Sequence, residues 1–132
     1  MVGHSKGGHE ATWNAIKTGR SCITFNTMAM TIFSKDFMSL STWMELISYQ
    51  GKLDSGEVTM THYVVRGEAL NVIFGEQKIG TTVYLPTQHS SPWWDIRGTV
   101  SSLTNNHFMS AVIAALKQEA RTSTMTSSGG KF

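Results

Sequence analysis

The sequence EVTMTHYVVR, residues 57–66, carries the clearest secondary-structure pattern in the chain. It is dominated by β-branched and aromatic side chains, which are enriched in strands, and it predicts a strand over its whole length. Gly67 follows directly, and a second run of the same character occupies residues 69–74. A glycine-containing connection between two such runs is typical of a β-hairpin, so we predict one over residues 57–74.

Similar patterns lie on both sides of this hairpin. Upstream, residues 13–16 and 21–27 flank a short glycine-containing connection, which predicts an N-terminal β-hairpin. Downstream, residues 79–85 and 93–100 are rich in β-branched and aromatic side chains and predict two more strands. These segments together indicate an antiparallel β-meander sheet.

Residues 34–50 have two interpretations. The first is a helix capped by Ser34, with apolar side chains at helical spacing: Phe37, Leu40, Met44 and Ile47. The second is a strand, because apolar and polar side chains also alternate over residues 41–48 and the segment is rich in serine and threonine, which form helices poorly. We favour a strand for the second half and leave the segment open.

The C-terminal part differs in kind. Residues 104–106 offer a helix cap, and the apolar side chains that follow recur at helical spacing. This pattern predicts an amphipathic helix whose apolar stripe lies on a sheet or on a partner. The stripe consists of Phe108, Met109, Val112, Ile113, Leu116 and Ala120.

Length and composition place limits on the protein. The 132 residues predict a single domain over 1–132, with residues 1–10 and 122–132 as loose termini. Charged residues make up 15% of the chain, against about 25% in typical domains, which favours a surface covered by other copies. The single cysteine, Cys22, excludes an intrachain disulfide and is expected in the core. No apolar run is long enough for a membrane span, and residues 1–10 do not resemble a secretory signal.

The sequence gives no reason to expect an enzyme. Its five histidines are scattered, and His4 and His9 stand among glycines in a segment that we interpret as a flexible terminus. No His or Cys cluster has the spacing of metal ligands, and the few carboxylates are dispersed. We therefore expect no catalytic residues, no metal and no cofactor.

Two features indicate recognition instead. Trp93 and Trp94 open a predicted strand and offer an aromatic surface on which a base or a sugar could stack. Thr59, Thr61 and Tyr63 alternate along residues 57–66, so their hydroxyl groups share one face of that strand. Such a face is suited to single-stranded RNA, whose bases are bound by stacking and by hydrogen bonds to their edges.

The order of these elements resembles that of the coat proteins of single-stranded RNA bacteriophages, the leviviruses. The similarity lies in STWM at residues 41–44, in EVTMT at 57–61, in the segments 93–99 and 103–106, and in the helix pattern at 108–119. The resemblance implies an α+β fold: an N-terminal β-hairpin, an antiparallel β-meander sheet, and a C-terminal helix that packs on the sheet of a dimer partner.

The same resemblance implies a function. The protein would be a capsid protein that forms homodimers, assembles into an icosahedral shell, and packages single-stranded RNA in the virion after assembly in the host cytoplasm, with no membrane or small-molecule partner. An RNA hairpin would also be bound to repress translation, although Glu57 and the absence of basic residues in 69–74 depart from the family pattern. The implied RNA-binding residues are Thr59, Thr61, Tyr63, Arg66, Trp93, Asp95 and Arg97, and the implied dimer and assembly residues are Phe108, Met109, Val112, Ile113 and Leu116.

Two other classes of binding protein remain open. One is a carbohydrate- or lipid-binding β protein similar to lectins or actinoporins, because a polar loop followed by Trp93 and Trp94 is typical of such binding surfaces. The other is a protein that binds single-stranded nucleic acid without forming a shell.

Overall fold

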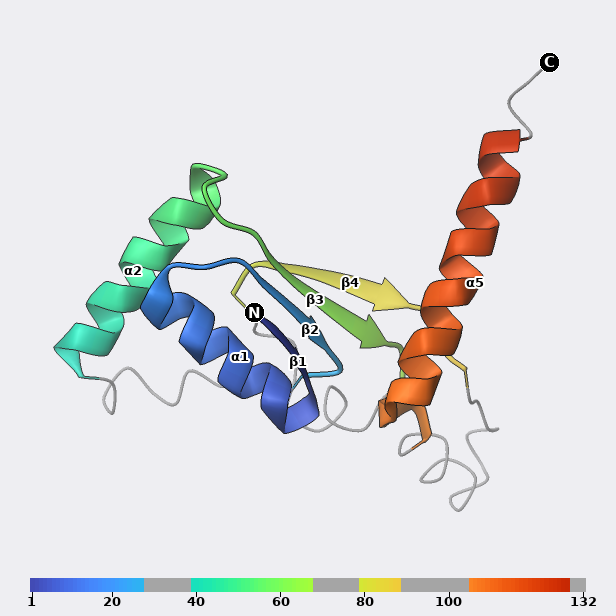
Figure 1. Ribbon diagram of the computed structural model, residues 1–132, viewed down its shortest axis with the longest axis horizontal. Helices are drawn as coiled ribbons and strands as arrows, with labels where there is room; N and C mark the ends of the chain where they lie inside the picture. Colours follow the sequence, from blue (N-terminus) through green and yellow to red (C-terminus); the bar gives the residue numbers. More distant parts are fainter. Residues whose placement is uncertain (28–38, 68–78, 89–104, 129–132) are drawn as a thin grey trace.

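The computed structural model describes residues 1–27, 39–67, 79–88 and 105–128, with side chains as far as residue 124. Within these residues, strands and helices follow one another along the chain (Figure 1). The elements are β1 (Val2–His4), α1 (Ser5–Thr18), β2 (Cys22–Phe25), α2 (Leu40–Asp54), β3 (Met60–Val65), β4 (Thr81–Leu85) and α5 (Met109–Ser128).

The four strands form one sheet in the order β1-β2-β3-β4, and every neighbouring pair is parallel. The expected antiparallel β-meander is therefore wrong. Parallel neighbours cannot be joined by a tight turn and need a crossover, usually a helix. Here α1 supplies the crossover from β1 to β2, and α2 lies between β2 and β3 in the chain.

The predicted N-terminal hairpin is a helix followed by a strand. Residues 13–16 belong to α1, and the connection that we interpreted as a hairpin turn is the end of this helix. Gly19 has a positive φ of 62° and donates its N–H to the carbonyl groups of Ala15 and Ile16, which is a common way to end a helix. Residues 1–10 are not a loose terminus, since they form β1 and the first turns of α1.

The segment left open in the sequence is resolved from Ser39 onward, where α2 begins. The Ser39 side chain accepts a hydrogen bond from the backbone N–H of Thr42 at 3.2 Å, so it caps the helix. The preferred strand over residues 41–48 is wrong. The helix was the other interpretation, but its predicted apolar stripe does not face the core, because Leu40, Met44 and Ile47 are exposed. The buried side chains of α2 are Leu46 and Tyr49.

One side of the sheet is covered by α1 and α2. Their buried side chains pack with Cys22 of β2 and Met60 of β3, which are partners in the parallel register. Cys22 is 1% exposed, as predicted for a core residue. The α1 and α2 contribution to this cluster consists of Ala11, Ala15, Ile16, Leu46 and Tyr49.

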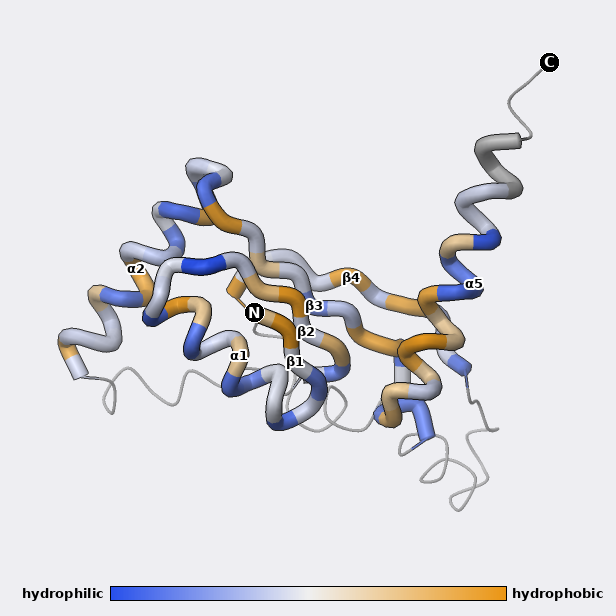
Figure 2. Tube along the Cα trace, in the orientation of Figure 1, coloured by the Kyte–Doolittle hydropathy of each residue, from blue (hydrophilic) through white to orange (hydrophobic). Residues whose placement is uncertain are grey.

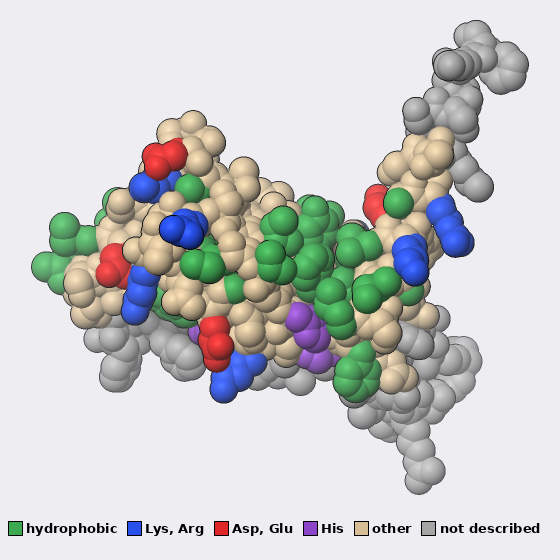
Figure 3. Space-filling view, in the orientation of Figure 1, with side chains coloured by type: hydrophobic (Ala, Val, Ile, Leu, Met, Phe, Trp, Pro, Cys, Tyr) green, Lys and Arg blue, Asp and Glu red, His purple; other side chains and the backbone are tan. Residues whose placement is uncertain are grey.

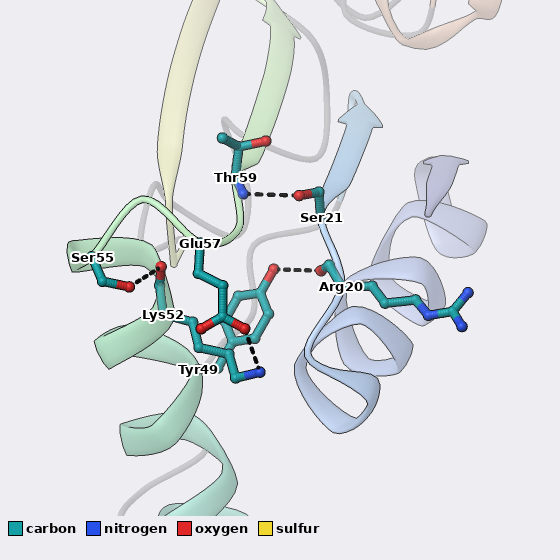
Figure 4. A network of polar contacts seen from close by, with 7 residues as sticks. All are labelled: Arg20, Ser21, Tyr49, Lys52, Ser55, Glu57 and Thr59. Carbon is teal, nitrogen blue, oxygen red and sulfur yellow. Dashed lines mark hydrogen bonds and ion pairs between the residues drawn. The ribbon is translucent and has the colours of Figure 1, made fainter.

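Polar contacts connect α2, the turn between α1 and β2, and the segment that leads into β3 (Figure 4). The Tyr49 hydroxyl donates to the carbonyl oxygen of Arg20 at 2.8 Å, and the Ser21 hydroxyl accepts from the N–H of Thr59 at 3.0 Å. Lys52 forms an ion pair with Glu57 at 2.9 Å. These contacts lie at the ends of the strands where β2 and β3 begin.

Helix α5 packs against β3 and β4 on the opposite side of the sheet from α1. Val112 and Ala115 are completely buried against Val65 and Leu85 of this same chain. Residues 117–124 of α5 are mostly hydrophilic (Figure 2), and this part of the helix extends away from the sheet (Figure 1).

The helix itself was predicted correctly. Within this chain Val112 and Leu116 of its stripe pack on the sheet, whereas Phe108, Met109 and Ile113 are 54%, 37% and 46% exposed. Burial of these three side chains against a partner stays a prediction. Residues 122–128, expected to be loose, continue α5.

The strands predicted downstream of residue 57 are confirmed in part. Residues 57–66 contain β3, which is shorter than predicted, and residues 79–85 contain β4. The second half of the predicted hairpin, residues 69–74, and the predicted strand 93–100 lie outside the described residues.

Candidate active site

A sharp turn joins β1 to α1 at Ser5. The residue has a φ of +54°, a left-handed backbone conformation that is uncommon outside glycine. Serine is not suited to this conformation, and holding it there costs about 1–3 kcal/mol. The turn presents the half-buried Ser5 side chain at the end of β1, at the first residue of a 14-residue helix.

Two glycines make this turn possible by allowing the backbone to pass close to itself. A Cβ atom added to Gly3 would overlap the carbonyl group of Gly7 and lie 2.7 Å from the Cα atom of Gly8. A Cβ atom added to Gly8 would lie 2.6 Å from Oγ1 of the buried Thr27. At Gly7, in contrast, such an atom would have no neighbour within 4 Å. Gly3 and Gly8 are therefore required by packing.

A histidine from the other end of the chain meets Ser5. His107 lies in a short helical turn at residues 105–107, just before α5, and its ring is half-buried. Its Nε2 atom lies 2.8 Å from Oγ of Ser5, within hydrogen-bond distance, although 102 positions separate the two residues. When Nε2 carries no proton, the Ser5 hydroxyl donates to it.

The backbone of His107 is held by two donors. The His4 ring donates from Nε2 to the His107 carbonyl oxygen at 2.9 Å, and the amide of Asn26 donates to the same oxygen at 3.1 Å. The rings of His4 and His107 also lie close together, with their centroids 5.3 Å apart. His107 is thus fixed from β1 and from the end of β2.

The arrangement supplies a nucleophile and a base in contact. A serine hydroxyl is a weak nucleophile until an adjacent base accepts its proton, and a neutral imidazole is the usual base. The first N–H groups of α1 lie directly after Ser5, and the positive end of the helix dipole favours negative charge there. Lys6 contributes the backbone N–H next to the nucleophile.

Other groups with chemical potential serve the structure. His62 is 2% exposed, and its ring accepts from the Thr24 hydroxyl at 2.7 Å and donates to the carbonyl oxygen of Ile79 at 2.7 Å. Burial raises the pKa of the Cys22 thiol, which disfavours a reactive thiolate. Among residues 1–27, 39–67, 79–88 and 105–128, no group of three His, Cys, Asp or Glu side chains is placed to hold a metal.

The residues predicted to bind RNA do not gather at this site. Thr59 is exposed before β3 begins, Thr61 and Tyr63 are half-buried within the strand, and Arg66 is exposed beyond its end. Tyr63 stacks on Phe25 with ring centroids 5.6 Å apart, and Arg66 lies over the ring of Tyr84. The remaining predicted contacts, Trp93, Asp95 and Arg97, lie outside the described residues.

Ser5 was not among the residues predicted from the sequence, because residues 1–10 were interpreted as a loose terminus and the chain was wrongly taken to contain no G-x-S-x-G pattern. Those residues include Gly3-His4-Ser5-Lys6-Gly7, which has the form G-x-S-x-G. In serine hydrolases this pattern marks a nucleophile on a sharp strand-to-helix turn, and it is meaningful only in that context. The strand β1 before Ser5 and the helix α1 after it provide the context.

Exposed hydrophobic side chains neighbour the site in the sequence. Val2, three positions before Ser5, is 72% exposed, and Phe108, directly after His107, is 54% exposed. Figure 3 shows histidine side chains on one face, beside a group of hydrophobic side chains and near α5.

No protein-family model matches the chain, and no match is found among curated proteins. Within the part of the chain that the structure describes, the helices are too short or too polar to pass through a lipid bilayer.

Proposed function

We propose that the protein is a serine hydrolase, with Ser5 as the nucleophile and His107 as its general base and acid. One observation carries the proposal: the 2.8 Å contact between Ser5 Oγ and His107 Nε2, at a strand-to-helix turn where Ser5 has a φ of +54°. Enzymes of the α/β-hydrolase kind hold their nucleophile in this way, above a parallel sheet and on a G-x-S-x-G turn.

The chemistry follows from the two residues. Ser5 Oγ attacks the carbonyl carbon of an ester while its proton passes to Nε2 of His107. The negative charge on the carbonyl oxygen is stabilised by the backbone N–H that follows Ser5 at the start of α1. His107 then gives its proton to the departing alcohol, which leaves Ser5 acylated. A water molecule releases the acid by the same two proton transfers in reverse.

A carboxylate that orients the histidine completes most sites of this kind, and it lies between the serine and the histidine in the chain. Several carboxylates stand in that interval. Glu68, the residue after Gly67, is one of them and lies outside the described residues. The proposal therefore rests on Ser5 and His107 alone.

The exposed apolar side chains next to the site favour an ester with an apolar acyl group. Val2 precedes Ser5 by three residues, Phe108 follows His107, and both side chains are exposed. Burying them against a substrate would contribute to binding. A short acyl chain such as butyrate is the first substrate class to test.

This proposal differs from two expectations drawn from the sequence, namely that the protein is a coat protein and that it is not an enzyme. The coat-protein resemblance implied an antiparallel sheet, and the observed sheet is parallel, so the fold on which that resemblance depended is absent. RNA binding and shell assembly remain untested predictions. We no longer favour the expectation of a non-enzyme, because Ser5 and His107 form a nucleophile–base pair.

The test uses a fluorophosphonate probe, which reacts only with an activated serine, together with p-nitrophenyl butyrate hydrolysis. We expect the probe to modify Ser5, as located by mass spectrometry of the digested protein. Ser5→Ala should abolish labelling, and His107→Ala should slow it by at least about 10³-fold, because each removes one half of a unit that acts together.

Ser48→Ala is the matched control, since Ser48 is exposed on α2 and distant in sequence from the site. It should label at the rate of the unaltered chain. A folded chain that is not labelled, or that is labelled equally well after Ser5→Ala, would contradict the proposal. Thermal unfolding of each variant, followed by circular dichroism, shows which of them are folded.

A further inference from the structure

Asn26 lies immediately after β2 and is completely buried. Its φ of +43° places it, like Ser5, in the left-handed region. Asparagine tolerates this conformation better than most side chains do. The conformation turns the chain at the end of β2 and leaves the Asn26 amide between β3 and the His107 segment, as its hydrogen bonds show.

The Asn26 side chain makes three hydrogen bonds, and they join segments far apart in the sequence. Its Oδ1 atom accepts from the backbone N–H of Val65, at the end of β3, at 2.8 Å. Its Nδ2 group donates to the carbonyl oxygens of Asn106 and His107, at 2.8 Å and 3.1 Å. The backbone N–H of Asn26 donates in addition to the carbonyl oxygen of Tyr63 at 2.8 Å.

We infer that Asn26 is a positioning residue for His107. It fixes the backbone of residues 106 and 107 to the ends of β2 and β3, and so it places the imidazole at Ser5. The inference rests on the proposed function, because it gives Asn26 a role in catalysis through His107. Asn26 makes no contact with the reacting atoms.

The chemistry of the amide suits this task. The site needs one acceptor, for Val65 N–H, and donors for two carbonyl oxygens, and a primary amide supplies all of these from one side chain. Aspartate has the same shape but lacks the donors, so Asn26→Asp keeps the bond from Val65 and loses both bonds to the His107 segment. A neighbouring anchor is Asn106, whose Oδ1 accepts from the N–H of Gln88 after β4.

The first experiment measures fluorophosphonate labelling of Asn26→Asp per folded molecule, with the folded fraction taken from circular dichroism. We expect labelling to slow by about 100-fold, which is the scale of the effect when a reacting group is displaced by about 1 Å. Butyrate ester hydrolysis should lose kcat with little change in KM, because substrate contacts are not altered. Asn14→Asp, on the exposed face of α1, is the matched control and should behave as the unaltered chain.

A double variant separates positioning from general stability. In a His107→Ala background, Asn26→Asp should slow the residual labelling by less than about twofold, because coupled residues do not act additively. A full additional 100-fold loss in that background would overturn the inference, and so would an unchanged rate in the single variant.

Failure of the proposed function gives a different result, since the unaltered chain would then not be labelled, or Ser5→Ala and His107→Ala would leave its labelling unchanged. Asn26→Gly provides a second variant, because glycine accepts a positive φ and carries no charge. If neither Asn26 variant folds, Asn26 is a folding residue and the positioning role is rejected.

Discussion

Among the residues 1–27, 39–67, 79–88 and 105–128, Ser5 and Asn26 are the two non-glycine residues with positive φ, at +54° and +43°. They follow the neighbouring strands β1 and β2, and both are linked by hydrogen bonds to His107. Backbone strain of this kind persists only where surrounding contacts enforce it, and it concentrates at functional sites. The two outliers therefore support the same hypothesis from independent parts of the chain.

The glycines at the Ser5 turn make a sharp residue-level prediction. Gly3→Ala should destabilise the fold by about 1–3 kcal/mol and lower probe labelling, because the added methyl group collides with the backbone of Gly7 and Gly8. Gly7→Ala should be neutral or stabilising by up to about 1 kcal/mol, since its methyl group meets open space within a helix. Urea unfolding measures both. Equal destabilisation by the two substitutions would contradict the turn geometry.

At the level of elements, sequence patterns identified the segments that are apolar and regular, namely β3, β4 and α5. They failed for α1 because its first turns contain Gly7, Gly8 and His9, which are poor helix formers. Tertiary packing of Ala11, Ala15 and Ile16 against the sheet outweighs that local preference. Ser5 was missed together with the helix: the prediction that the chain has no G-x-S-x-G pattern was wrong, and the pattern carries meaning only between a strand and a helix.

Substitutions at two neighbouring residues of α5 test which face of this helix packs against the sheet. Val112→Asp should cost about 3–5 kcal/mol in urea unfolding, because it places an unpaired charge against Val65 and Leu85. Ile113→Asp should change stability by less than about 0.5 kcal/mol, since Ile113 is 46% exposed. A large loss for Ile113→Asp, together with a loss of oligomers in size-exclusion chromatography, would instead support the predicted self-association through this face.

For the whole molecule, the parallel order of the sheet was not predicted. β propensity describes a single strand and does not give the direction of its neighbours. The direction of each strand depends on the crossovers, so misreading α1 as a hairpin reversed the topology. The Ser5–His107 site was missed for a related reason, since it joins residues that no local window contains together.

The buried core also predicts how stability depends on pH. Burial raises the pKa of the Cys22 thiol and of the Tyr49 phenol, so both groups ionise more readily in the unfolded chain. Their contribution to stability is therefore complete below about pH 8.5 and is lost as pH rises toward 10 and beyond.

Urea unfolding between pH 7 and pH 10 should show this decline, and Cys22→Ala should make it shallower. An identical decline in the variant would show that the thiol does not contribute.

The meeting of the first and last parts of the described chain has a consequence for biosynthesis. The proposed base of Ser5 is synthesised 102 positions after it, once the four described strands have been made. If Ser5 and His107 act as proposed, a nascent chain is unreactive at Ser5 until His107 has left the ribosome and docked. Labelling of Ser5 would then report that these two segments have folded together.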